Sequence, residues 1–79
     1  MKSSIDKILD CSGLICPEPV MMLHKAVREV SAGQTIELIA TDPSTVRDVA
    51  KFCSFLGHEL KTQHQDEDKY FFYITKGGI

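Results

Sequence analysis

Residues 13–21, GLICPEPVM, place one cysteine, Cys16, directly before the triplet Pro-Glu-Pro. A helical pattern of apolar residues follows at once. Proline suits the first turn of a helix, where a missing N–H costs no hydrogen bond, so we expect Pro17 at the first helical position and Pro19 in the same turn. The two prolines stiffen the backbone and keep the helix from extending back over the thiol. The pattern predicts that Cys16 lies at the N-terminus of a helix.

A thiol in that position has altered chemistry. It faces the positive end of the helix dipole and the unpaired N–H groups of the first turn. Both favour the thiolate, which is the nucleophilic form of cysteine, although the charge of Glu18 opposes them slightly. We therefore predict that the pKa of Cys16 lies below that of an ordinary cysteine. Packing is the alternative role, because free cysteines are among the most buried residue types.

The positions of the other two cysteines predict structural roles. Cys53 falls on an apolar helical stripe, which predicts core packing, and Cys11 beside the first strand is also expected to be structural. There is no Cys-x-x-Cys pair, and a Cys11–Cys16 disulfide stays open as an alternative. A zinc site would have to combine Cys11, Cys16, His24 and either His58 or His64. That spacing matches no standard ligand set, so we expect no metal. No phosphate-binding loop is visible either, and we expect no bound cofactor.

Two helices are predicted from apolar residues three and four positions apart. The first stripe consists of Val20, Leu23, Val27 and Val30, and the glycine in SAGQ, residues 31–34, ends that helix. A second helix follows TDPST, residues 41–45, with Asp42 as N-cap and Pro43 at the first helical position. Its stripe consists of Val46, Val49, Ala50, Cys53 and Leu56, and Gly57 stops it.

Four strands surround these helices. They are expected at residues 5–10, at 35–40, at 58–64 as a polar edge strand, and at 69–76, with a turn in QDED at 65–68. The order is β-α-β-α-β-β. Right-handed crossovers make the first two strands parallel, and the last two form a hairpin. We expect a single domain, residues 1–79, folded as a two-layer α/β (α+β) sandwich in which both helices cover one face of a four-stranded mixed sheet.

Composition narrows the function. The 79 residues carry a formal net charge of −2, which argues against broad electrostatic binding to nucleic acid. The longest apolar run, residues 70–74, is too short to span a bilayer, and the N-terminal ten residues lack the apolar core of a signal peptide, so a cytoplasmic protein is expected. A chain this small cannot enclose a large substrate, which places any chemistry at the surface and points to a macromolecular partner.

Residues 9–27, LDCSGLICPEPVMMLHKAV, resemble the signature of the TusA-type (SirA-like) sulfur carriers. The resemblance rests on an aspartate, a glycine three residues later and then Cys-Pro-x-Pro, which here are Asp10, Gly13, Cys16, Pro17 and Pro19. It continues through residues 40–60 and the closing KGG at 76–78, so it covers nearly the whole chain. The two-layer fold of that family agrees with the order of elements predicted above.

The resemblance implies a covalent sulfur relay rather than a classical enzyme. A PLP-dependent cysteine desulfurase would load sulfur onto Cys16 as a persulfide, and a TusBCD-type relay would receive it for 2-thiolation of wobble uridine in tRNA. The carrier would not itself bind tRNA and is expected to be a monomer, so that its cysteine stays free. Supporting roles at the loop and helix start fall to Asp10, Gly13, Pro17, Glu18 and Pro19. Candidates for partner contacts are Met21, His24, Lys25, Arg28 and Phe55, although the basic residues among them could equally form a solvated helix face.

Two other interpretations stay open. The chain could be a non-catalytic regulatory module in which Cys16 senses redox state, a role that should survive loss of sulfur transfer. It could also deliver sulfur to another pathway, such as molybdenum-cofactor, dissimilatory-sulfur or selenium chemistry. In the sulfur-carrier interpretation, Cys11 is an extra thiol that could protect Cys16 or resolve its persulfide.

Overall fold

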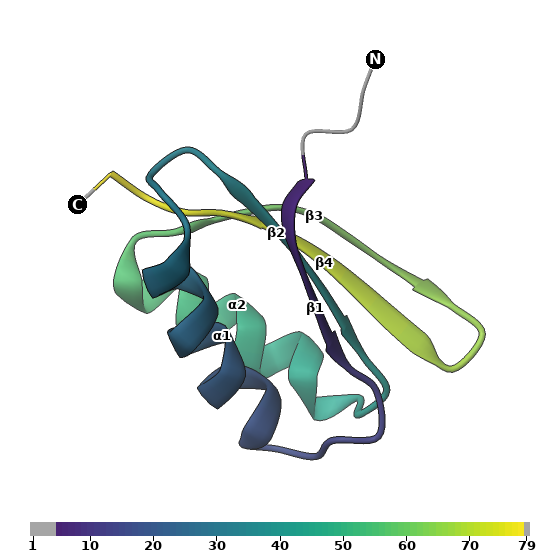
Figure 1. Ribbon diagram of the computed structural model, residues 1–79. Helices are drawn as coiled ribbons and strands as arrows, with labels where there is room; N and C mark the ends of the chain where they lie inside the picture. The colour runs from purple at the N-terminus through teal and green to yellow at the C-terminus, as the bar shows by residue number, and fades with distance from the viewer. Residues whose placement is uncertain (1–4, 79) are drawn as a thin grey trace.

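The computed structural model describes residues 5–78 and has the predicted order of elements (Figure 1). Residues 1–4, which belong to the stretch argued not to be a signal peptide, and residue 79 lie outside the described part. The elements are β1 (Ile5–Cys11), α1 (Glu18–Glu29), β2 (Thr35–Ala40), α2 (Ser44–Leu56), β3 (Glu59–Asp66) and β4 (Lys69–Thr75). Neither helix in the described range is long and apolar enough to cross a membrane.

The four strands form one mixed sheet, as predicted, and their order across it is β1-β2-β4-β3. β1 runs parallel to β2, while β4 is antiparallel to both β2 and β3. The register places Leu9 beside Leu38 and Leu38 beside Phe72. Because β1 and β2 are parallel, they end at the same edge of the sheet, and the loops that follow them lie next to each other there (Figure 1). This arrangement positions the candidate site.

Both helices cover one face of the sheet, which confirms the two-layer prediction (Figure 1). The core lies between the layers, where alternate residues of β2 and β4 meet the apolar stripes of the helices. Its most buried members include Leu23, Ile36, Leu38, Val49, Phe72 and Ile74. Cys11 and Cys53 are buried there too, which confirms their structural roles, and the Cys11 sulfur lies 3.9 Å from that of Met22.

Both helices begin one residue later than predicted. Pro17 and Pro43 are the N-cap residues rather than the first helical ones, so Pro19 is the second residue of α1. The carbonyl of Pro17 accepts a hydrogen bond from Met21 N at 3.1 Å. At α2, Asp42 still supports the helix start, because its Oδ1 accepts the N–H of Ser44 at 3.1 Å.

The hairpin is longer and its turn tighter than predicted. β3 continues to Asp66, which pairs with Lys69 of β4, so the turn consists of Glu67 and Asp68 alone. Glu67 has a φ of 58°, the left-handed conformation that such a short connection requires. The side chains of β3 are almost all exposed, as predicted for an edge strand, because backbone pairing to β4 does not depend on an apolar face.

Candidate functional site

The loop between β1 and α1 carries Cys16 and is held from the neighbouring loop between β2 and α2. Gly13 N donates to Thr41 Oγ1 at 2.9 Å, and Cys16 N donates to Asp42 Oδ2 at 2.9 Å. Gly13 has a φ of +83°, a conformation that residues with a Cβ rarely adopt. These hydrogen bonds hold the backbone around Cys16 against the β2–α2 loop, so the thiol is attached to a well-fixed segment of backbone.

Asp10 makes a more local contact at the start of the same loop. Its Oδ1 accepts a hydrogen bond from Ser12 N at 3.0 Å, and the hydrogen bonds from Ser12 lower the pKa of Asp10. The anchors that reach across from another element are Thr41 and Asp42. Sequence reasoning assigned Asp42 only to the start of the second helix and did not single out Thr41.

Cys16 is the exposed thiol of this chain. All three cysteines are free; Cys16 is exposed, whereas Cys11 and Cys53 are buried. Within residues 5–78, no group of three or more His, Cys, Asp or Glu side chains is placed to hold a metal ion. Cys16 is therefore the cysteine that an external reagent or partner can reach.

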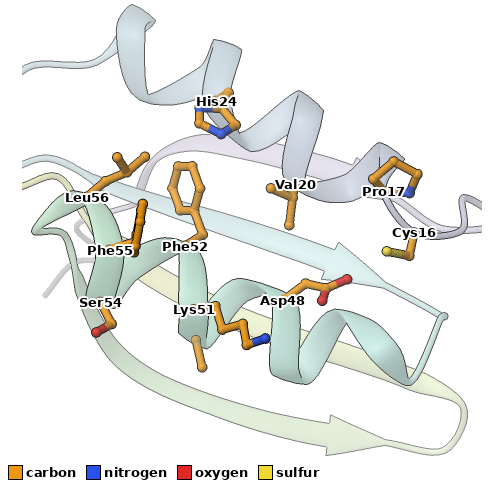
Figure 2. Close-up of a pocket in the computed structure, with 11 residues that line it drawn as sticks. Cys16, Pro17, Val20, His24, Asp48, Lys51, Phe52, Ser54, Phe55 and Leu56 are labelled. Atoms are coloured by element: carbon orange, nitrogen blue, oxygen red, sulfur yellow. The ribbon is translucent and has the colours of Figure 1, made fainter.

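A groove runs between α1 and α2, away from Cys16 (Figure 2). It is open to solvent and has a volume of about 960 Å³. Cys16 and Pro17 line one end, and Phe55 and Leu56 line the other. Between these two ends the surface is mostly apolar, so the thiol lies at one end of a hydrophobic groove.

Aromatic side chains build the middle of this groove. The ring of Phe52 is buried and meets the edge of His24 at a centroid distance of 4.7 Å, with the planes at 89°. Phe52 also stacks with the ring of His58, at a centroid distance of 5.5 Å. Phe55, three residues further along α2, is 91% exposed. Phe52 thus forms the floor of the groove, while Phe55 lies free at its rim.

The predicted candidates for partner contacts lie on two different surfaces. His24 and Phe55 line the groove. Met21, Lys25 and Arg28 are exposed on α1 but do not line it. The groove and the exposed face of α1 are therefore two neighbouring surfaces, and only the first is continuous with Cys16.

The predicted lowering of the Cys16 pKa is wrong. A hydrogen bond with the Asp48 side chain is the largest cause of a raised pKa at Cys16, followed by desolvation and by the charges of Asp48 and Asp42. Arg47 opposes these effects. The prediction considered only the helix that follows Cys16, yet α1 begins two residues later, and the carboxylates come from α2 and the loop before it.

Two of these site residues, Asp48 and Phe52, were missed although their spacing to Phe55, a predicted partner contact, was visible. Asp48, Phe52 and Phe55 follow one another at intervals of four and three residues, which places them on one side of a helix. That stripe runs beside the predicted core stripe of α2. It could have been interpreted as a side shared by the core, where Phe52 is buried, and the surface, where Phe55 is exposed. The meeting of Asp48 with Cys16 has no local signal, because it joins two separate elements (Figure 2).

Comparison with known proteins agrees with this geometry. A family model described as Sulfurtransferase TusA matches residues 7–76. The chain belongs to the TusA family. The Sulfur carrier protein TusA of Pseudomonas aeruginosa strain LESB58 is 55% identical over 76 residues, which cover 96% of each chain. The protein of the same name from Pseudomonas entomophila strain L48 is 59% identical over 71 residues, covering 90% of this chain and 89% of the relative.

A solved structure supports the TusA-family fold independently. The crystal structure of the SirA-like protein from Desulfitobacterium hafniense superposes with a TM-score of 0.80. The match covers 91% of this chain and 99% of the other, at 22% sequence identity. Identity at this level supports the shared architecture alone, and the family assignment rests on the sequence matches.

Proposed function

We propose that this TusA-family chain is a sulfur carrier in which Cys16 holds the transferred sulfur as a persulfide. A cysteine desulfurase supplies the sulfur, and a TusBCD-type relay receives it for 2-thiolation of wobble uridine in tRNA. The observation that carries the proposal is the placement of Cys16. It is the exposed cysteine, on a loop anchored by Asp42 and Thr41, at the end of an open apolar groove.

The chemistry is a transfer of sulfane sulfur between thiols. The Cys16 thiolate attacks the terminal sulfur of the donor's cysteine persulfide, as a thiolate attacks a disulfide. A sulfur–sulfur bond forms at Cys16 while the one in the donor breaks, and the donor cysteine leaves as a thiolate that takes up a proton. The same exchange in the next step passes the terminal sulfur to the acceptor. No net oxidation occurs.

The surroundings of Cys16 suit such an exchange between two proteins. The attacking and leaving sulfur atoms must lie in line, which requires an accessible thiol on a well-defined backbone. The groove leading away from Cys16 offers apolar area, including the exposed ring of Phe55, for a partner to cover. We further propose that the carrier acts in the cytoplasm and as a monomer, so that this face stays available to each partner in turn.

Intact mass measured under non-reducing conditions tests the carrier role. The protein is incubated with a cysteine desulfurase, PLP and cysteine, and we expect the mass to increase by one sulfur atom. The gain should be absent from Cys16→Ser and present in Cys53→Ala, a matched variant that removes a buried thiol. Loading of Cys16→Ser, or no loading of the wild type by any of several desulfurases, would refute the assignment.

The acceptor pathway requires a separate test in cells. Deletion of the protein should remove 2-thiouridine from the wobble position of the affected tRNAs, and wild type but not Cys16→Ser should restore it. Restoration by Cys16→Ser would favour a regulatory module instead. Normal thiolation in the deletion strain would refute the tRNA pathway and favour another sulfur acceptor. It would not affect the conclusion of the loading experiment.

A further inference from the structure

Asp48 is the acidic side chain that faces the Cys16 thiol across the end of the groove (Figure 2). It lies on α2, whereas Cys16 lies in the loop before α1, so the contact joins the two sides of the groove. The Asp48 side chain is only 19% exposed, and its Oδ1 lies 3.6 Å from Arg47 Nε. Its position is therefore set by the helix and not by free rotation in solvent.

Other charged groups surround the same thiol, and their signs differ. The groups that act on it or line its groove are Asp42 from the β2–α2 loop, Arg47, Asp48 and Lys51 from α2, and His24 from α1. Glu18 lies in the first turn of α1, two residues after Cys16. Asp42 is engaged by the backbone, since its Oδ2 accepts the N–H of Cys16. Lys51 and His24 lie further along the groove (Figure 2). Asp48 is thus the carboxylate directed at the sulfur itself.

We propose that Asp48 is a positioning residue that restrains Cys16, holding it as a protonated thiol while the carrier is free. A carboxylate beside a thiol disfavours a second negative charge and accepts the S–H hydrogen bond. The thiol is a much poorer nucleophile than the thiolate, so the free carrier reacts slowly with oxidants and other electrophiles. The inference deepens the proposed function and rests on Cys16 being the carrier thiol.

Alkylation by iodoacetamide between about pH 6 and about pH 10 tests the restraint on the isolated protein, with intact mass as the readout and Cys16→Ser as the blank. In Asp48→Asn the midpoint of the rate profile should move to lower pH. The rate at neutral pH should rise by roughly threefold for each tenfold gain in thiolate, because a more acidic thiolate is intrinsically less nucleophilic. A purely structural role for Asp48 would not move the midpoint.

Two further variants keep the test decisive. Arg47→Gln removes an exposed cation whose charge lowers the pKa of Cys16, so this variant should move the midpoint to higher pH. Asp68→Asn makes the same chemical change as Asp48→Asn in the exposed β3–β4 turn and should leave the profile unchanged. An unshifted profile in Asp48→Asn, with wild-type circular dichroism, would overturn the restraint, as would a shift of Arg47→Gln in the downward direction.

The outcomes for the restraint and for the carrier role are separable. Sulfur loading of Cys16 together with an unshifted Asp48→Asn profile would support the carrier role and refute the restraint by Asp48. A shifted profile in a protein that never accepts sulfur would do the reverse. The alkylation experiment needs no donor protein, so its result does not depend on finding the cognate desulfurase.

Discussion

The backbone N–H of Cys16 donates a hydrogen bond to the Asp42 carboxylate at 2.9 Å, although 26 positions separate the two residues in the chain. The same carboxylate accepts the N–H of Ser44 through its other oxygen. One side chain therefore joins the start of α2 to the loop that carries the thiol. Parallel β1 and β2 make this contact possible, because both strands deliver their loops to one edge of the sheet.

Replacing Asp42 by Asn should weaken this junction in a pH-dependent way. The hydrogen bonds from Cys16 and Ser44 lower the pKa of Asp42 below its ordinary value of 3.8. A lowered folded-state pKa stabilises the fold at pH above the ordinary value, and this contribution disappears as the pH falls through the folded-state pKa. Urea unfolding should therefore show wild type more stable than Asp42→Asn at neutral pH, with the difference shrinking well below pH 3.8.

Asp66→Asn provides the matched control, because it changes an exposed aspartate in β3, away from the loop. It should not reproduce the loss of stability at neutral pH. Sulfur loading by Asp42→Asn should also slow several-fold, since a loosened loop spends less time with the sulfur in line for attack. Equal stability of Asp42→Asn and wild type across the pH range would contradict the role of this junction.

The fold could be predicted because its determinants are local. The residues of TIELIA alternate between apolar and polar faces, and β2 occupies the predicted residues 35–40. In the same way the stripe through Leu23 and Val27 gave α1 its buried face. The handedness of the crossovers made the first two strands parallel, and the short final connection made the last two strands a hairpin. The ends of elements shifted, since a proline can serve as N-cap as well as first helical residue. The buried face of α2 also differs from the predicted stripe, because Phe52 is buried while Ala50 and Leu56 are exposed.

The chemistry around Cys16 was harder to predict because it depends on contacts between distant segments. The motif identified the thiol, but its proton affinity is decided by Asp48 and Asp42, which approach from another helix and loop. A local argument from the helix dipole had the wrong sign for this reason. The groove was hidden as well, since it exists only once α1 and α2 lie side by side.

Phe52 and Phe55 should separate stability from partner binding. Phe52 is 5% exposed, so Phe52→Ala should cost about 3 to 5 kcal/mol of unfolding free energy. Phe55 is 91% exposed, and Phe55→Ala should change that free energy by less than about 0.5 kcal/mol. If a partner covers this ring, Phe55→Ala should nevertheless raise the apparent KM of the desulfurase for the carrier by about tenfold. An unchanged KM would remove Phe55 from the partner surface.

The C-terminal segment packs closely at one glycine and loosely at the next. A Cβ on Gly77 would collide with the carbonyl oxygen of Gly57, which ends α2 in a left-handed conformation. Backbone cannot yield as a flexible side chain can, so Gly77→Ala should cost about 1 to 3 kcal/mol in thermal or urea unfolding. Gly78→Ala meets nothing within 4 Å and should be neutral within about 0.5 kcal/mol. Equal effects of the two would contradict this packing.

His58 should make the same segment sensitive to pH. Its Nδ1 accepts the N–H of Gly77 at 2.9 Å, an interaction that requires the neutral ring. Burial, followed by the charges of Lys76 and His24, lowers the pKa of His58 from its ordinary 6.5. A lowered histidine pKa means that the folded state binds protons less readily than the unfolded chain. The contribution is therefore complete above pH 6.5 and is lost as the pH falls from there through the lower folded-state pKa.

Urea unfolding at about pH 8 and about pH 5 measures this loss. Wild type should lose stability between the two conditions, and His58→Asn, which keeps an acceptor but no longer titrates, should lose less. His64→Asn on the exposed strand β3 is the matched control and should keep the wild-type decrease. If His58→Asn showed the full decrease, neutral His58 would not be what holds Gly77, and the attachment of the C-terminal segment would rest instead on the backbone hydrogen bonds that join Lys76 to Gly33 and Gln34.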